Sequence, residues 1–126
     1  MIIGIGFDII EVARIRKAIE NPRFLARVYT SDEIAYCNAR GRQSSLSFAA
    51  RFAAKEAVAK ALGTGFRNAA LHDVEIINDE LGKPMVRLTE NLKKLANAKG
   101  CVRLHVSLSH TAAYAVAQVI LEGDGK

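Results

Sequence analysis

The sequence predicts a single α+β domain over residues 1–126, in which a mostly antiparallel sheet packs against helices. One observation is the alanine-rich stretch Phe48–Leu62, which contains no Gly or Pro and therefore favours a helix. Another is the alternation of apolar and polar residues over Cys101–His110, which is typical of a strand with one buried face. With 126 residues, 50% of them hydrophobic, the chain is long enough for one core and too short for two.

The first expected element is a strand over Ile2–Ile10, which is apolar enough to be buried. Gly4 and Gly6 have no side chain, so another backbone could approach this strand closely. Asp8 interrupts the apolar run, and a buried carboxylate is costly without a partner. Two interpretations of Asp8 stay open: it meets a metal ion or a cation, or it caps the helix that follows the strand.

Two short helices are expected before the alanine-rich stretch. The first covers residues 12–19 with an amphipathic pattern and ends before Pro22, because proline disfavours helical geometry in the residue that precedes it. The second begins at Thr30 and Glu33, which form a capping-box pattern, and continues to about residue 40. A polar loop is then expected before the central helix.

Beyond the central helix, the pattern predicts a hairpin, a helix and two further strands. The expected elements are strands over Val74–Asn78 and Met85–Leu88, a helix from Thr89 or Glu90 to near Gly100, strands over Cys101–His110 and Tyr114–Leu121, and a frayed tail. The polar row of the longer strand consists of Arg103, His105, Ser107 and Ser109. Such a row either binds phosphate or forms the solvated face of a sheet.

Composition narrows the classes of function. The net charge of +5 and the pI near 9.5 indicate an anionic partner, which could be nucleic acid, a phosphorylated small molecule or an acidic protein. Nucleic-acid binding is the distant alternative, because aromatic residues make up only 6% and no recognition motif is present. We expect a cytoplasmic protein with no membrane span, since the sequence has no long apolar run, no signal-peptide pattern and no disulfide framework.

The central helix carries an acid and a base on one stripe. Ala49, Ala53, Glu56 and Lys60 follow one another at helical spacing. Taken alone, this pattern favours a surface helix with an ordinary ion pair. Taken with Asp8, Glu56 could share one hard cation, because Mg²⁺ typically binds one or two protein carboxylates together with phosphate oxygens. Lys60 would then face the same phosphate.

Basic and apolar side chains mix between residues 14 and 27. Arg14 lies on the first short helix, and Arg23 precedes Phe24 just beyond it. A solvated charged face is the more ordinary interpretation. A cluster that combines arginine with apolar side chains is also what docking of an acidic helix requires.

Four stretches of the sequence together resemble the holo-(acyl-carrier-protein) synthase family of the 4′-phosphopantetheinyl transferase superfamily. They are GIGFDIIEVARI, RFAAKEAVAKALGTG, NDELGKP and HVSLSHTAAYAVAQV, and they extend over nearly the whole chain in the family's order. The resemblance implies that coenzyme A donates its 4′-phosphopantetheine arm to a serine of apo acyl carrier protein. The reaction would require Mg²⁺, release adenosine 3′,5′-bisphosphate and support fatty acid biosynthesis.

The resemblance also implies roles for individual residues. Asp8 and Glu56 would hold Mg²⁺ on the pyrophosphate, Lys60 would neutralise the leaving group, and Glu56 would accept the serine proton directly or through a metal-bound water. The nucleotide would lie near Arg51, Lys60, Gly63, Gly65 and His105, and the carrier protein would contact Arg14, Arg23 and Phe24. Members of this group resemble trimers with active sites between subunits, so a homotrimer is expected.

One rival enzyme class shares part of this pattern. A different magnesium-dependent enzyme that acts on a nucleotide pyrophosphate would also use Asp8, Glu56 and Lys60. It would have no need of the basic surface that carries Arg14.

Overall fold

The computed structural model describes residues 1–63 and 71–125, and it confirms the predicted α+β class. In chain order the elements are β1 (Ile2–Glu11), α1 (Val12–Ala18), α2 (Pro22–Val28), α3 (Ser31–Asn38), α4 (Ser44–Leu62), β2 (Val74–Asn78), β3 (Pro84–Leu88), α5 (Glu90–Ala98), β4 (Cys101–His110) and β5 (Tyr114–Gly123). No helix in these two ranges is both long and apolar enough to cross a membrane.

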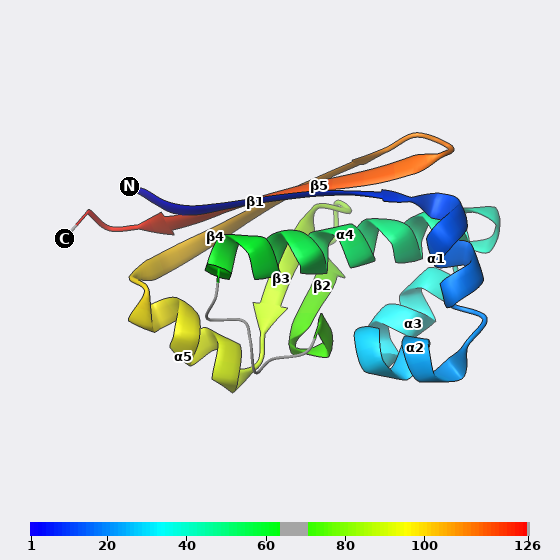
Figure 1. Cartoon of the computed structure of the whole chain (residues 1–126), viewed down its shortest axis with the longest axis horizontal. Helices are drawn as coiled ribbons and strands as arrows, with labels where there is room; N and C mark the ends of the chain where they lie inside the picture. The colour runs from blue at the N-terminus through cyan, green and yellow to red at the C-terminus, as the bar shows by residue number, and fades with distance from the viewer. Residues whose placement is uncertain (64–70, 126) are drawn as a thin grey trace.

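The strands form two antiparallel sheets on either side of the central helix. The larger sheet has the strand order β1-β5-β4, and β2 and β3 pair as a separate hairpin. Helix α4 runs along the larger sheet beneath β1 and β5 (Figure 1). Helices α1, α2 and α3 gather near one end of α4, and α5 lies near the other end (Figure 1). Because α4 is central, it contacts both sheets and the helices α1 and α3.

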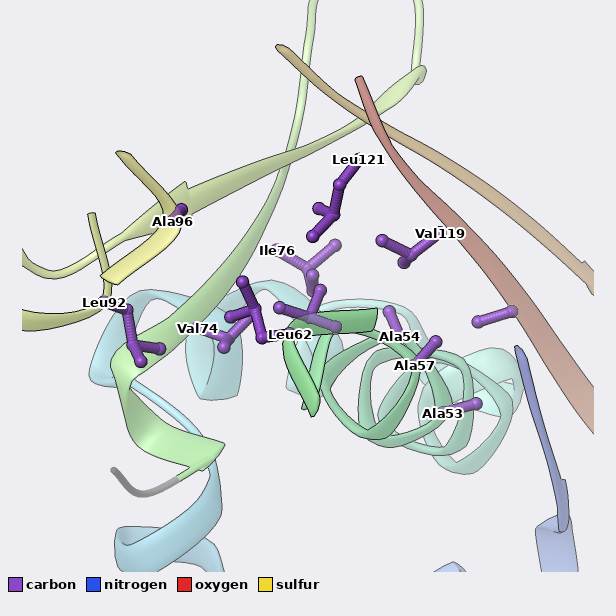
Figure 2. Packing of buried hydrophobic residues seen from close by; sticks show 12 residues of the cluster. Ala53, Ala54, Ala57, Leu62, Val74, Ile76, Leu92, Ala96, Val119 and Leu121 are labelled. Atoms are coloured by element: carbon purple, nitrogen blue, oxygen red, sulfur yellow. The ribbon is translucent and has the colours of Figure 1, made fainter. Parts of the chain in front are cut away.

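The main core fills the space between α4, the hairpin, β5 and α5. Figure 2 shows small side chains of α4 turned toward larger apolar ones from the surrounding elements. The cluster consists of Ala53, Ala54, Ala57, Val58, Leu62, Val74, Ile76, Leu92, Ala96, Ala117, Val119 and Leu121. Because alanine contributes only a methyl group, the sheet and the hairpin can both pack closely on the same helix.

Glycine allows β1 to lie directly on α4, as the sequence predicts. A Cβ atom added to Gly6 would overlap the backbone carbonyl of Ala57. A Cβ atom added to Gly4 would lie 2.6 Å from the carbonyl oxygen of Ala61 and 3.0 Å from Leu121 Cδ1. Any side chain at these two positions would therefore push the strand away from the helix.

A fully buried ion pair joins α3, α4 and β2. Lys55 Nζ lies 2.7 Å from Glu33 Oε1, and it also donates hydrogen bonds to the backbone carbonyls of Leu71 and Val74. Glu33 Oε2 accepts a hydrogen bond from the Ile76 amide at 2.8 Å. Burial lowers the pKa of Lys55, and the Glu33 carboxylate opposes this shift. Because each charge has several partners, the pair fixes how these three elements meet.

Several local predictions need correction. The segment after Asn21 is a helix, α2, because Pro22 occupies the first turn and the Asn21 side chain caps the Arg23 amide. Helix α4 begins at Ser44, after a short 3₁₀ turn, where a polar loop was expected. The last strand continues to Gly123, since pairing with its neighbours orders residues that were expected to fray.

The strand β1, predicted to be buried, has only one covered face in the single chain. Ile5, Phe7 and Ile9 are 60%, 53% and 55% exposed. Side chains alternate along a strand, and only the face that carries Gly6 and Asp8 meets α4. No described segment of the chain covers the outward face.

We predict that Gly6→Ala lowers the free energy of unfolding by about 1–3 kcal/mol or more, because the new methyl group meets a backbone carbonyl that cannot rotate away. Gly4→Ala, whose methyl group meets a less severe overlap, should cost less. Urea denaturation of both variants and the wild type measures the difference. Equal stability of all three proteins would contradict the close packing of β1 on α4.

Candidate functional site

The contact between β1 and α4 brings Asp8, Glu56 and Lys60 together. Lys60 Nζ lies 3.0 Å from Asp8 Oδ1 and donates a second hydrogen bond to the Phe7 carbonyl at 3.0 Å. Partial burial raises the pKa of Glu56, the Asp8 carboxylate raises it further, and Lys60 lowers it. Two carboxylates and one ammonium group thus lie near one another where β1 packs against α4.

The cap interpretation of Asp8 does not hold. Glu11 is the N-cap residue of α1, and no side chain in the described part of the protein caps that helix. The Asp8 side chain instead turns toward α4, where Lys60 contacts it. The half-buried Asp8 carboxylate therefore has a cationic partner, which was one of the two interpretations left open by the sequence.

Asp8 and Glu56 form a donor set that could hold a hard divalent cation. Lys60, which contacts Asp8, lies one helical turn after Glu56 on α4, so the two carboxylates flank the same ammonium group. Within residues 1–63 and 71–125, no group of three or more His, Cys, Asp or Glu side chains is arranged for a metal. Two carboxylates are nevertheless enough for Mg²⁺, which commonly completes its shell with water and phosphate oxygens.

A second site is a cavity of about 460 Å³ between α3, α4, the β2–β3 turn and β4. Its lining includes four side chains that can carry positive charge. These are Arg40, Arg51, Lys83 and His110. A cavity of this size with a basic lining is suited to a phosphorylated small molecule.

Arg51 is the most constrained of these basic side chains. It is only 4% exposed, and its guanidinium lies 4.2 Å from the centroid of the Tyr36 ring. Its Nη2 donates a hydrogen bond to Asn78 Oδ1 at 2.6 Å, and Nη1 donates one to Ser47 Oγ at 3.3 Å. The sequence pointed to Arg51 by resemblance, but it gave no signal for Tyr36.

The structure separates His105 from Arg51. His105 Nε2 lies 2.9 Å from Glu122 Oε1 on the outward face of the sheet, and this contact is the main cause of the lowered pKa of Glu122. His110, at the far end of the same strand, lines the cavity instead. Sequence reasoning missed His110, although it belongs to the HVSLSH motif.

Of the two glycines predicted to lie near the nucleotide, Gly63 is among the described residues and Gly65 is not. Gly63 ends α4 with a φ of 70°, which confirms the predicted helix stop. It does not belong to the described lining of the cavity. Gly65 lies outside the described residues.

The predicted docking surface is only partly available. Arg14 and Arg23 are exposed on α1 and α2. Phe24 is half-buried, with ring centroids 6.2 Å from Tyr29 and 6.0 Å from Phe52. Phe24 therefore packs mainly against the smaller core, and the two arginines form the charged part of this surface.

The carboxylate group and the basic cavity are separate in the single chain. Among the described residues that line the cavity, none is Asp8, Glu56 or Lys60. Arg51 and Glu56 both lie on α4, but their spacing of five residues directs them to different sides of the helix. The chain thus carries one place suited to a metal and another suited to a nucleotide.

Comparison with known proteins identifies the family of this chain. Residues 4–119 match the family model described as the 4′-phosphopantetheinyl transferase superfamily. A holo-(acyl-carrier-protein) synthase of Clostridium novyi (strain NT) is 50% identical over 125 residues, which cover 98% of this chain and 90% of that relative.

Solved structures show the same fold. A holo-(acyl-carrier-protein) synthase from Bacillus anthracis, described in complex with CoA (3′,5′-ADP), is 38% identical with a TM-score of 0.81, covering 98% of this chain and 99% of the other. The enzyme of Neisseria meningitidis is 36% identical with a TM-score of 0.88, covering 97% and 99%. The chain therefore belongs to the 4′-phosphopantetheinyl transferase superfamily, within its holo-(acyl-carrier-protein) synthase group.

Proposed function

We propose that this protein transfers the 4′-phosphopantetheine group of coenzyme A to a serine of apo acyl carrier protein in a magnesium-dependent reaction. The reaction releases adenosine 3′,5′-bisphosphate and serves fatty acid biosynthesis in the cytoplasm. The observation that carries the proposal is the convergence of Asp8, Glu56 and Lys60 in a chain of this family. A Clostridium relative and a CoA-bound Bacillus structure, both named holo-(acyl-carrier-protein) synthases, support it.

Asp8 and Glu56 are the residues that would hold Mg²⁺. When bound, the ion withdraws charge from the pyrophosphate of the coenzyme and so makes its phosphorus more open to attack. The protein supplies the two carboxylates from different elements. Their positions depend on the packing of β1 against α4 rather than on a flexible loop.

During the transfer, one side chain would stabilise negative charge on the leaving group and another would accept the serine proton. The serine oxygen of the carrier protein forms a bond to the pantetheine-side phosphorus, and the bond from that phosphorus to the oxygen of the leaving nucleotide breaks. Lys60 can stabilise the charge that develops on the leaving phosphate. Glu56 is the candidate acceptor of the serine proton, either directly or through a water molecule.

The nucleotide end of coenzyme A is assigned to the basic cavity. Arg51 and Lys83 offer cationic groups there, and His110 adds a ring that can donate a hydrogen bond. His105 lies outside this cavity in the single chain, where it contacts Glu122, and its predicted role at the nucleotide is proposed for a site completed by a neighbouring subunit. The carrier protein would dock on the exposed Arg14 and Arg23, where an acidic helix finds complementary charge.

A homotrimer would bring the two separated sites together. The outward face of β1 exposes Ile5, Phe7 and Ile9, which form a contiguous apolar row in the single chain. Covering this face with a neighbouring subunit would remove the row from water. The carboxylates of one subunit could then meet the cavity of the next, which accounts for their separation within one chain.

The proposed reaction is tested by the intact mass of an apo acyl carrier protein incubated with this protein, coenzyme A and Mg²⁺. We expect a gain of one phosphopantetheine group that disappears when a chelator is added. No gain with several carrier proteins while coenzyme A is still cleaved would favour an enzyme that acts on the pyrophosphate alone. No change in either substrate would contradict the proposal.

We predict that Glu56→Gln lowers turnover by about a hundredfold or more, because it removes a charged group that acts in the transition state. Glu90→Gln, at an exposed glutamate of α5, is the matched control and should leave turnover unchanged. Steady-state rates at saturating Mg²⁺ measure both variants. Turnover within twofold of the wild type would remove Glu56 from the site.

We predict that Arg14→Glu weakens binding of the carrier protein about tenfold while the affinity for coenzyme A is retained, because it reverses charge on the docking surface alone. Lys94→Glu makes the same charge change on α5 and should have little effect. Surface plasmon resonance and calorimetry give the two affinities. An equal loss of both affinities in Arg14→Glu would reject this docking surface.

A further inference from the structure

One buried guanidinium connects three elements around the basic cavity. Arg51 comes from α4, the ring that it contacts belongs to Tyr36 at the end of α3, and its hydrogen-bond acceptor Asn78 ends β2. Both polar atoms of the Asn78 side chain are hydrogen-bonded: Oδ1 accepts from Arg51, and Nδ2 donates to the Gly82 carbonyl at 3.0 Å. A continuous chain of contacts thus runs from α3 through α4 to the β2–β3 turn.

The guanidinium of Arg51 retains unused hydrogen-bonding capacity. It has five N–H donors, and hydrogen bonds to Ser47 and Asn78 occupy two of them. Its Nε is buried and has no hydrogen-bond partner in the described parts of the chain. A buried charged group with free donors is costly, and an anion in the adjacent cavity would accept hydrogen bonds from the remaining Nη donors.

The neighbouring groups determine which way these donors point. A free arginine side chain has several rotatable bonds, and the hydrogen bond to Ser47, at 3.3 Å within the same helix, restrains it only weakly. The Tyr36 ring fixes the plane of the guanidinium from one element, and Asn78 fixes its rotation from another. The ring of Tyr36 also lies 5.7 Å from the Arg40 guanidinium, a second cation of the cavity.

We propose that Tyr36 and Asn78 are positioning residues that hold the Arg51 guanidinium ready for a phosphate group of the bound nucleotide. This inference rests on the proposed function, because it takes the nucleotide of coenzyme A as the occupant of the cavity. Tyr36 and Asn78 also line the cavity, and the inference is that their effect on nucleotide binding passes through Arg51. The affinity gain comes from pre-organisation, since the arginine does not lose its freedom at the moment of binding.

A double-mutant cycle on nucleotide binding tests this dependence. The ligand is adenosine 3′,5′-bisphosphate, and calorimetry measures its dissociation constant for the full-length protein. We expect Tyr36→Leu to weaken binding about five- to tenfold, whereas Tyr36→Phe keeps the aromatic face and restores most of the affinity. In an Arg51→Met background, Tyr36→Leu should change the affinity by less than about twofold, because the group it positions is gone.

Asn78→Ala and Arg51→Met form a second, independent double-mutant cycle. This cycle replaces the first if a thermal unfolding experiment shows that the Tyr36→Leu variant is not folded. We expect the same non-additive result, because Asn78 acts on the same guanidinium. Additive losses in both cycles would overturn the inference, since they mean that each side chain contacts the nucleotide by itself. A wild-type protein that neither binds the nucleotide nor modifies a carrier protein would overturn the proposed function as well.

Discussion

The close contact between β1 and α4 is the constraint on which the rest of the structure depends. It exists because Gly6 has no side chain and Ala57 presents its carbonyl directly beneath the strand. The same contact places Asp8 beside Lys60, and it brings the Asp8 carboxylate close enough to influence the pKa of Glu56. Packing and chemistry are therefore linked here: a strand held farther from the helix would lose both the dense core and the shared carboxylate site.

Buried charge plays a second organising role. Lys55 and Glu33 contribute nothing to the proposed chemistry, yet both are fully buried and hydrogen-bonded to backbone groups of β2. Removing one member of such a pair would leave an uncompensated charge in the core, so we expect the loss of either residue to be strongly destabilising. By fixing α3 and β2 on α4, the pair also sets the distance across which Tyr36 and Asn78 reach Arg51.

The two candidate sites lie in different parts of the fold. The carboxylate site lies on the packed contact of β1 with α4, and the basic cavity lies between α3, α4, the hairpin turn and β4. Coenzyme A carries its pyrophosphate on the 5′ oxygen and a further phosphate on the 3′ oxygen of one ribose, so in the proposed reaction each site would take one of these groups. In the proposed trimer, burial of the apolar outward face of β1 would favour association of the subunits and bring the two sites together.

The sequence by itself determined the features that depend on local periodicity and chain geometry. The alanine-rich helix, the alternation over Cys101–His110 and the capping box of α3 are each decided by residues close in sequence, and the structure confirms them. The sequence also led to the hypothesis that Asp8, Glu56 and Lys60 meet, and the structure places Lys60 in contact with Asp8. Tertiary structure alone decided that His110 rather than His105 lines the cavity, and that Tyr36 supports Arg51. The physical reason is that these relations join elements far apart in the chain, so they depend on the packing angle and register of the elements, which no local pattern encodes.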